Sequence, residues 1–372
     1  MARVKYGFLN AWNRAVLSVR RMTAGSRRDR QRRNVWHNTL FAGEPLESRV
    51  LLTLSSGPVA VASPILISGT TGSDVFTVSY STTTPATATV RISSNGSASK
   101  LVGTYNAAIP LSFAGLFGSD AVKLIGTSGK EQFAVSGGVV KTNSAALTIN
   151  SIEDIELVGG GNDDIYSFDA DTTLPRIFID EAGGGIDTLD FSLTTMQEVN
   201  VDLSSALLQA VNFNMRLQLR NPTALENAIG GSRDDGLIGN ANANFLVGGP
   251  GNDLLNGQAG NDLLIGGLGY DHLSGGLNDD IVITGRTTYD GNINALKDLL
   301  AEWKSTAPFS TRVARLRSGV GASKALLAAK STVLHDSFAS DIVRGDGGQD
   351  WFFCGVEERA IDQAFGEISD RL

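Results

Sequence analysis

Asp or Asn recurs at every ninth position between residues 230 and 283, always followed two places later by an aliphatic residue. The segment reads as six abutting nonamers: GGSRDDGLI, GNANANFLV, GGPGNDLLN, GQAGNDLLI, GGLGYDHLS and GGLNDDIVI. Each nonamer has glycine first, Asp or Asn sixth and an aliphatic residue eighth. Carboxylate and carbonyl oxygens are the ligands that hard divalent cations prefer. This spacing therefore predicts a row of cation sites rather than a single centre.

These nonamers need neighbours, because one aliphatic side chain per nine residues cannot make a core alone. The first six places favour a glycine turn, and the last three favour a short strand whose eighth-place side chain points inward. Two nonamers would form one coil of a flattened roll, so that blocks 18 residues apart stack on one another. The inward residues would be Leu237, Leu246, Leu255, Leu264, Leu273 and Val282.

Stacking would gather the sixth-place residues into two edges. One edge would carry Asp235, Asp253 and Asp271, and the other would carry Asn244, Asp262 and Asp280. Neighbouring strands lie about 4.8 Å apart, and two carboxylates at that distance repel by about 3 kcal/mol at an effective dielectric near 20. A cation between the rungs would remove the repulsion. The rung that Asn244 shares with Asp262 should bind a cation less well, because Asn244 carries no charge. The alternative is a glycine-rich solenoid that binds no metal.

The nonamer frame stops after residue 283 and returns at residues 336–353. There Asp341 and Asp350 hold the sixth place, where they would stack on Asp271 and Asp280 and resume the roll. We expect an apolar cap at the end of the resumed roll, formed by Trp351, Phe352 and Phe353, followed by a C-terminal tail at 354–372.

Residues 284–335 differ in composition from the repeats. Ile293, Leu296, Leu300 and Trp303 recur at helical spacing, behind Asn292 as a candidate N-cap. This pattern predicts a small helical insertion between coils, which a short linker could replace. Trp303 could pack on the roll or stack on a sugar.

The tandem pattern GGxGxDxUx resembles the repeats of the RTX, or hemolysin-type calcium-binding, family. The resemblance covers residues 230–283 and, less closely, 336–353. It implies a right-handed parallel β-roll, calcium (Ca2+) as the bound ion, and secretion to the extracellular space or cell surface with calcium-driven folding after export. The implied ligands are the sixth-place side chains of Asp235, Asp253, Asp271, Asp341, Asn244, Asp262, Asp280 and Asp350, with turn residues Gly249, Gly251, Gln258, Gly260, Gly267 and Gly269.

Residues 63–229 are β-rich, with short Val, Ile, Thr and Phe runs between turn residues. Degenerate nonamers recur at irregular spacing: Gly69–Thr77, Gly115–Lys123, Gly126–Ala134, Gly159–Ser167 and Ala182–Asp190. The segment is expected to be either a looser solenoid or a β-sandwich. Asp164 and Asp187 are candidate calcium ligands here, or ordinary turn residues that bond their own backbone.

Residues 1–62 are expected to be a basic, disordered export or targeting segment. Residues 1–50 hold 11 Lys and Arg against 3 Asp and Glu, whereas the rest of the chain holds 20 against 36. The run Leu46–Leu52 (LESRVLL) resembles the Leu-Glu-Pro-Arg-x-Leu-Leu motif near the N-terminus of large exported bacterial proteins, with Ser48 in place of proline. Ala60-Val61-Ala62 has the form of a signal-peptidase site.

The chain carries no recognisable catalytic motif, and we expect no enzyme. Of its three histidines, His37 lies in the N-terminal segment, His272 is at an outward-facing strand position, and nothing near His335 looks like a nucleophile. The single Cys354 excludes an internal disulfide framework. The acidic body repels nucleic acid, and no apolar run is long enough to span a membrane. We expect a structural or adhesive surface protein whose candidate partners, besides calcium, are extracellular polysaccharide and other surface proteins. The alternatives are a polysaccharide-active β-solenoid enzyme and a fragment of an RTX-type toxin.

Overall fold

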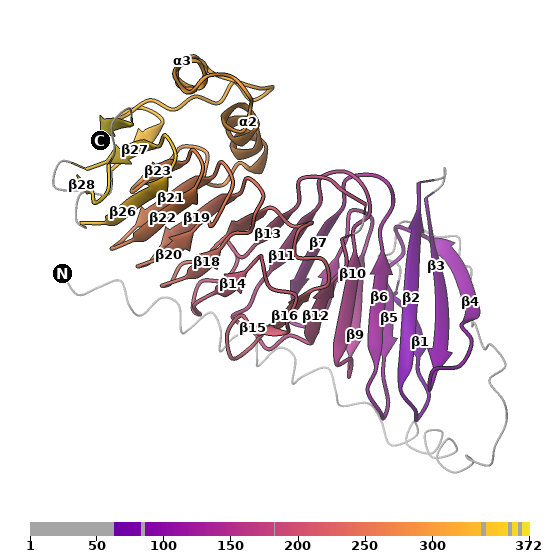
Figure 1. Ribbon diagram of the computed structural model, residues 1–372. Coiled ribbons are helices and arrows are strands. Elements are labelled where there is room, and N and C mark those ends of the chain that lie inside the picture. Colours follow the sequence, from indigo (N-terminus) through magenta and orange to yellow (C-terminus); the bar gives the residue numbers. More distant parts are fainter. Residues whose placement is uncertain (1–62, 83–85, 182, 336–339, 356–358, 364–366) are drawn as a thin grey trace, which may run out of the picture. The chain divides into compact units, whose positions relative to one another are not determined.

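The computed structural model describes residues 63–372, except 83–85, 182, 336–339, 356–358 and 364–366. This part of the chain is an all-β fold with three large sheets and two short helices (Figure 1). The predicted export segment at 1–62, with its LESRVLL and A-x-A motifs, lies outside the described residues.

Three large sheets and one small one contain the described strands. The 13-stranded sheet has the order β1 (Ile65–Ser68), β5 (Leu111–Ala114), β9 (Ala146–Asn150), β8 (Val139–Lys141), β7 (Gln132–Ser136), β11 (Ile165–Phe168), β13 (Thr188–Asp190), β17 (Asn227–Ile229), β19 (Phe245–Pro250), β21 (Leu263–Leu268), β23 (Ile281–Ile283), β27 (Trp351–Cys354) and β29 (Ile368–Arg371). The 8-stranded sheet has the order β15 (Gln209–Ala210), β16 (Arg216–Leu219), β12 (Arg176–Ile179), β10 (Asp154–Val158), β6 (Ala121–Ile125), β2 (Asp74–Ser81), β3 (Thr87–Ser94) and β4 (Lys100–Asn106). The 6-stranded sheet has the order β14 (Asn200–Asp202), β18 (Gly236–Ile238), β20 (Leu254–Asn256), β22 (His272–Leu277), β26 (Ile342–Gly347) and β28 (Arg359–Ala360). Strands β24 (Arg286–Thr287) and β25 (Val333–Leu334) form a separate antiparallel pair.

The nonamers form a parallel β-roll whose strands alternate between two sheets. On one side Leu237 pairs with Leu255 and Leu255 with Leu273; on the other Leu246 pairs with Leu264 and Leu264 with Val282. All six of these predicted inward residues are buried. The roll continues past the helices, because β22 pairs with β26 and β23 with β27 in the same parallel register.

The β-rich half is a looser solenoid and not a sandwich. Its strands pair in parallel from coil to coil, as in β2–β6–β10–β12 and β7–β11–β13–β17. Antiparallel hairpins, such as β2–β3–β4 and β7–β8–β9, are added at some coils. The 13-stranded sheet runs without a break from this half into the roll. One apolar core therefore extends from Ile67 to Ala360.

Two helices interrupt the roll between β23 and β26. Helix α2 spans Ile293–Trp303, and the Asn292 side chain accepts the Ala295 N–H at 3.1 Å, as the predicted N-cap should. Helix α3 spans Phe309–Ser318. Neither these helices nor any other helix in the described residues has the length and apolar character needed to cross a membrane.

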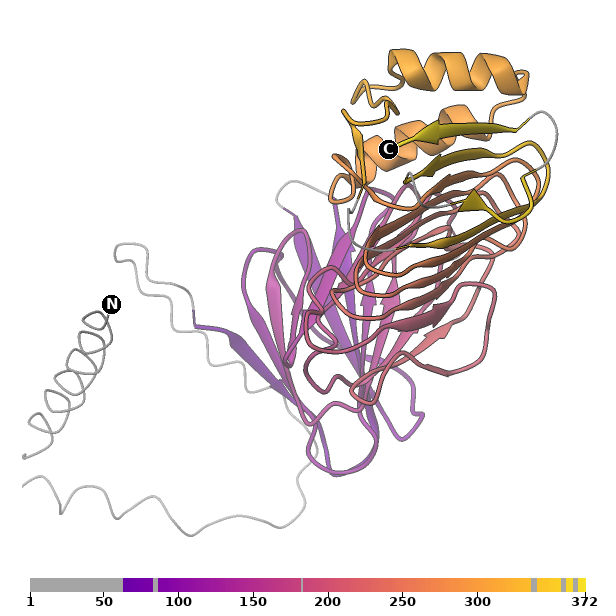
Figure 2. The ribbon, with the colours of Figure 1, turned by 90° about the vertical axis from the view of Figure 1, so that its left-hand side faces the viewer.

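The helices cover the outer face of the 13-stranded sheet (Figure 2). Strands β19, β21, β23 and β27 begin with the apolar triplets FLV, LLI, IVI and WFF, and all three residues of each triplet are buried. Such unbroken apolar strands are typical of a sheet buried on both faces. The outward residues contact α2 and α3, where Trp303 lies 6.2 Å from Trp351 and 5.6 Å from Phe309 between ring centroids. Trp303 thus packs on the roll, and a short linker in place of the insertion would expose this face.

The predicted cap and tail need correction. Phe352 faces the roll core, whereas Trp351 and Phe353 join the cluster under the helices. They do not end the roll, because residues 354–372 contribute β28, which pairs with β26, and β29, which pairs with β27. This last coil was missed because no nonamer marks it. Cys354 is buried.

We predict that Trp303→Ala lowers the free energy of unfolding by about 3–5 kcal/mol, because it empties a fully buried site shared by the helices and the sheet. The measurement is denaturant unfolding in excess calcium. Leu254→Ala, on the exposed face of β20, is the control and should change the free energy by about 0.5 kcal/mol or less. Equal effects of the two substitutions would contradict the packing role of the helices.

Candidate metal centre

The first-place glycine of each nonamer makes room for the sixth-place side chain. A Cβ atom built on Gly248 would lie 2.3 Å from Asp253 Oδ2, and one on Gly257 would lie 2.2 Å from Asp262 Oδ2. Both distances are too short for non-bonded atoms, so the carboxylate folds back over its own turn only if the first residue is glycine. The repeat pattern therefore couples the glycine to the acid.

The turn glycines also permit close stacking of successive coils. Gly267 and Gly269 have φ values of +118° and +135°, and a Cβ atom on either would lie within 2 Å of the carbonyl oxygen of Gly249 or Gly251 in the coil below. Among the candidate turn ligands, Gly249, Gly251 and Gly260 have positive φ, and so does Gln258 despite its side chain. The Gln258 carbonyl already accepts the Leu277 N–H at 2.8 Å.

Sixth-place carboxylates on the first edge are linked by the backbone. The N–H groups of Asp235, Asp253 and Asp271 donate to Oδ1 of the acid one coil further on, at 2.8, 2.8 and 2.7 Å; the acceptors are Asp253, Asp271 and Asp341. All four acids are buried. Each acid thus uses one oxygen to bind the neighbouring coil.

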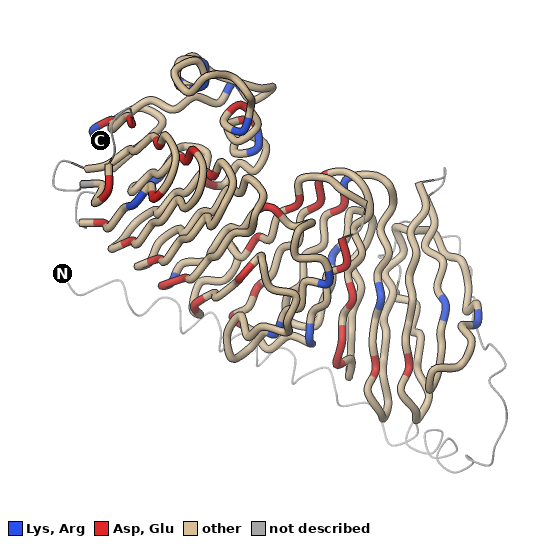
Figure 3. The backbone as a smooth tube through the Cα atoms, viewed as in Figure 1, with Lys and Arg blue, Asp and Glu red and all other residues tan. Residues whose placement is uncertain are grey.

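The second edge repeats the arrangement. The N–H groups of Asn244, Asp262 and Asp280 donate to Oδ1 of Asp262, Asp280 and Asp350, at 2.7, 2.8 and 2.7 Å. Asn244 differs from the acids, because its Oδ1 accepts the Asn240 N–H and its Nδ2 donates to the Glu226 carbonyl. The structure brings all eight predicted side chains into two rows, and acidic residues recur at the turns of successive coils (Figure 3).

The second carboxylate oxygen tests whether these rows fit a cation. Within residues 63–372 as described, the Oδ2 atoms of Asp253, Asp262 and Asp280 are buried and accept no hydrogen bond. Buried carboxylate oxygens with no donor are costly unless a cation or proton neutralises them. At the end of the first edge, by contrast, Asp235 Oδ2 accepts the Gly231 N–H at 2.5 Å. The inner rungs therefore fit a hard cation better than the end rung does.

Burial shifts the pKa of these acids strongly upward. Desolvation raises the pKa of Asp253 to about 7, that of Asp262 to about 9 and that of Asp280 to about 10. The Asp262 carboxylate adds to the shift of Asp280 by charge repulsion. At neutral pH each of the last two acids is therefore neutralised by a proton or by a bound cation.

The same backbone linkage extends into the degenerate half. The Glu131 N–H donates to Asp164 Oδ1, the Asp164 N–H to Asp187 Oδ1 and the Asp187 N–H to Glu226 Oε2, at 2.7, 2.7 and 2.8 Å. Coil lengths vary here, with sequence separations of 33, 23 and 39 residues against 18 in the roll. Glu226 was not among the sequence candidates. Like the others it stands directly before a strand, and an acid at that place is the signal that would have found it.

Comparison with known protein families gives a match to part of the chain. The family model described as Peptidase M10 serralysin C terminal matches residues 159–353. The match includes all six nonamers, the helical insertion and the resumed roll, and it begins at the turn before Asp164. No curated protein matches the chain.

We predict that Gly257→Ala weakens calcium binding by tenfold or more and lowers the thermal midpoint, because its Cβ would collide with Asp262 Oδ2 and with the Gly275 carbonyl. The loss of about 1.4 kcal/mol corresponds to that factor of ten. Gly291→Ala is the matched control, since an added Cβ there meets nothing within 4 Å. Calcium titration calorimetry compares the two variants, and similar isotherms for both would contradict the coupling of glycine to acid.

Proposed function

The chain belongs to the serralysin C-terminal family of peptidase M10, whose domain is a calcium-binding β-roll of the RTX type, and on that basis we propose that calcium ions bind between the acidic rungs of its roll. The proposed ligands are the sixth-place carboxylates and turn carbonyls named above, with Asn244 the weakest rung. The observation that carries the proposal is the set of buried Oδ2 atoms of Asp253, Asp262 and Asp280 that accept no hydrogen bond.

The donor set favours calcium over softer or smaller ions. Both edges offer carboxylate and carbonyl oxygens, and neither edge row contains a His or Cys ligand. Calcium takes six to eight such oxygens in irregular cages, whereas zinc prefers nitrogen and sulfur, and magnesium requires a small octahedron. Backbone turns and carboxylates held by hydrogen bonds suit the larger, less directional ion.

Calcium binding would also drive folding. The roll core has one inward aliphatic residue per nonamer, and the glycine turns lose much backbone entropy on ordering. Metal binding to the folded state alone adds its free energy to folding. Dissociation constants for calcium of about 0.1–1 mM, typical of extracellular calcium modules, would leave the roll unfolded inside a cell and folded outside it. This agrees with the secreted nature of serralysin C-terminal domains.

We further propose a structural or adhesive role at the cell surface. The matched domain is the non-catalytic C-terminal part of serralysin-type metalloproteases, which supports a structural module stabilised by calcium. Extracellular polysaccharide and other surface proteins are the proposed partners. A pull-down of the calcium-loaded chain on polysaccharide, repeated in chelator, tests the first of these.

We predict that Asp253→Asn and Asp262→Asn each weaken calcium binding more than Asp235→Asn. The inner rungs carry an Oδ2 with no donor, whereas the Asp235 Oδ2 is held by the Gly231 N–H. Replacement by Asn retains the Oδ1 acceptor and removes the charge. Calcium titration of the three variants measures the change in calcium affinity. An equal loss of affinity in all three would show that the end rung binds calcium as well as the inner rungs do.

We predict that the metal-free roll is more stable in mild acid than at neutral pH. The folded-state pKa values of Asp253, Asp262 and Asp280 lie above the unfolded value of about 4. Between that value and about pH 7 to 10 the folded state binds more protons than the unfolded state, so stability falls as pH rises. Calcium should replace these protons and restore the fold.

Circular dichroism across pH, in chelator and in millimolar calcium, measures this dependence. Calorimetry in buffers of different ionisation enthalpy should also detect protons released as calcium binds. A fully formed β structure in chelator at every pH from 5 to 9 would show that the acids need neither calcium nor protons to be stable in the fold.

A further inference from the structure

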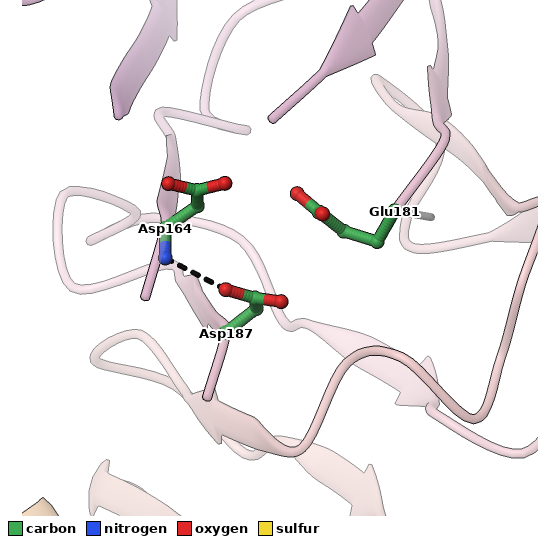
Figure 4. Close-up of side chains that lie close together, drawn as sticks. All are labelled: Asp164, Glu181 and Asp187. Atoms are coloured by element: carbon green, nitrogen blue, oxygen red, sulfur yellow. Dashed lines mark hydrogen bonds between the residues drawn. The ribbon is translucent and has the colours of Figure 1, made fainter. Parts of the chain in front are cut away.

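Three buried acids meet in the irregular half, outside the tandem nonamers. Asp164 precedes β11, Asp187 precedes β13, and Glu181 lies just beyond the end of β12 in the opposite sheet. One carboxylate oxygen from each lies within 4.8 Å of the other two. Figure 4 shows the three side chains pointing toward a common space. All three residues are at most 1 % exposed.

Each acid spends one oxygen on the protein and leaves the other without a donor. Asp164 Oδ1 accepts the Glu131 N–H and Asp187 Oδ1 accepts the Asp164 N–H, both at 2.7 Å, while the Tyr166 hydroxyl donates to Glu181 Oε1. Asp164 Oδ2, Glu181 Oε2 and Asp187 Oδ2 are buried and accept no hydrogen bond from the described residues. Three such oxygens in one space require a neutralising partner.

Among the described residues, the ammonium group whose charge acts on this cluster is that of Lys297, which partly offsets the rise that burial causes in the pKa of Asp187. Lys297 of α2 reaches the same turns, but its Nζ contacts Asp163 Oδ2 at 3.4 Å and donates to the Ile186 carbonyl.

We propose that Asp164, Glu181 and Asp187 together bind one hard divalent cation, calcium by its oxygen donors, and that this is the tightest cation site of the described chain. A regular rung offers one carboxylate per coil at each edge. Here the coil between Asp164 and Asp187 has 23 residues instead of 18, and the longer path brings in Glu181 as a third carboxylate. Ligand charge is one of the two properties that set calcium affinity in proteins.

If this site binds calcium before the others, it orders the coil on which the roll stacks. Strand β13 pairs with β17, and β17 pairs with β19, the first strand of the roll in the 13-stranded sheet. Fixing the turns before β11 and β13 therefore orders the strands that lead to the nonamers. The third carboxylate thus gives the irregular half a role in starting the roll.

The test is calcium titration of the calcium-stripped full chain at neutral pH. The native chain should show a tight class of sites and a weaker one, and Glu181→Gln should weaken the tight class by about tenfold or more while leaving the weaker class unchanged. Glu156→Gln is the matched control, because Glu156 pairs with Lys123 at 3.0 Å on β10 and should leave both classes unchanged. An isotherm of Glu181→Gln equal to that of the control overturns the proposal.

A spectroscopic readout covers the case in which Glu181→Gln does not fold. Terbium replaces calcium at oxygen sites and emits when a nearby aromatic ring is excited, and Tyr166 contacts Glu181 directly. Tyr166→Phe should remove the emission component that saturates first, while its ring still packs against Phe133. If that component is retained in Tyr166→Phe, the tight site lies elsewhere.

The result also separates this site from the roll. Asp262→Asn should alter only the weaker class, because Asp262 belongs to the regular edge. A loss of calcium affinity seen only in Glu181→Gln would support the three-acid site alone. A loss confined to Asp262→Asn would support the roll alone and overturn the three-acid site.

Discussion

The structure depends on one repeated contact, the hydrogen bond from a backbone N–H to the carboxylate of the next coil. It fixes the acid before each strand and holds successive coils in register, as from Asp253 to Asp271. The same contact occupies only one oxygen of the carboxylate. In the inner rungs the other is left buried without a donor, so each coil that stacks correctly also adds an oxygen to the proposed cation cage. The register of the coils and the proposed metal binding therefore depend on the same contact.

Much of the roll could be predicted from the sequence, because its rules are local and periodic. A fixed length of 18 residues sets which leucines pair, and the Asp271–Asp341 rung follows from the returning frame. The helix after Asn292 was evident from its apolar spacing and cap. The sequence also indicates which sheet the helices cover, because the unbroken apolar triplets FLV, LLI, IVI and WFF belong to strands of the 13-stranded sheet. This signal is visible only when these strands are compared with the strands of the 6-stranded sheet.

The irregular half was less predictable, because its coils have different lengths. Spacing cannot show that Glu181 from the opposite sheet meets Asp164 and Asp187, since only the three-dimensional path of the coil brings it there. Position relative to the strand is the better guide. Glu131, Glu226 and the nonamer acids all directly precede a strand, whatever the coil length. The last coil, β28 and β29, carries no repeat and was found only in the structure.

The insertion between β23 and β26 has a consequence for folding kinetics. It raises the separation of stacked rungs from 18 to 70 residues, and closing the longer loop costs about 1 kcal/mol more in chain entropy. That cost is small at equilibrium, which explains how a repeat array tolerates such an interruption. This entropy cost is incurred before the contact forms, however, so the rate at which β26 pairs with β22 is reduced. The coils before the insertion can form one after another along the chain. The coils after it can form only once the longer loop has closed.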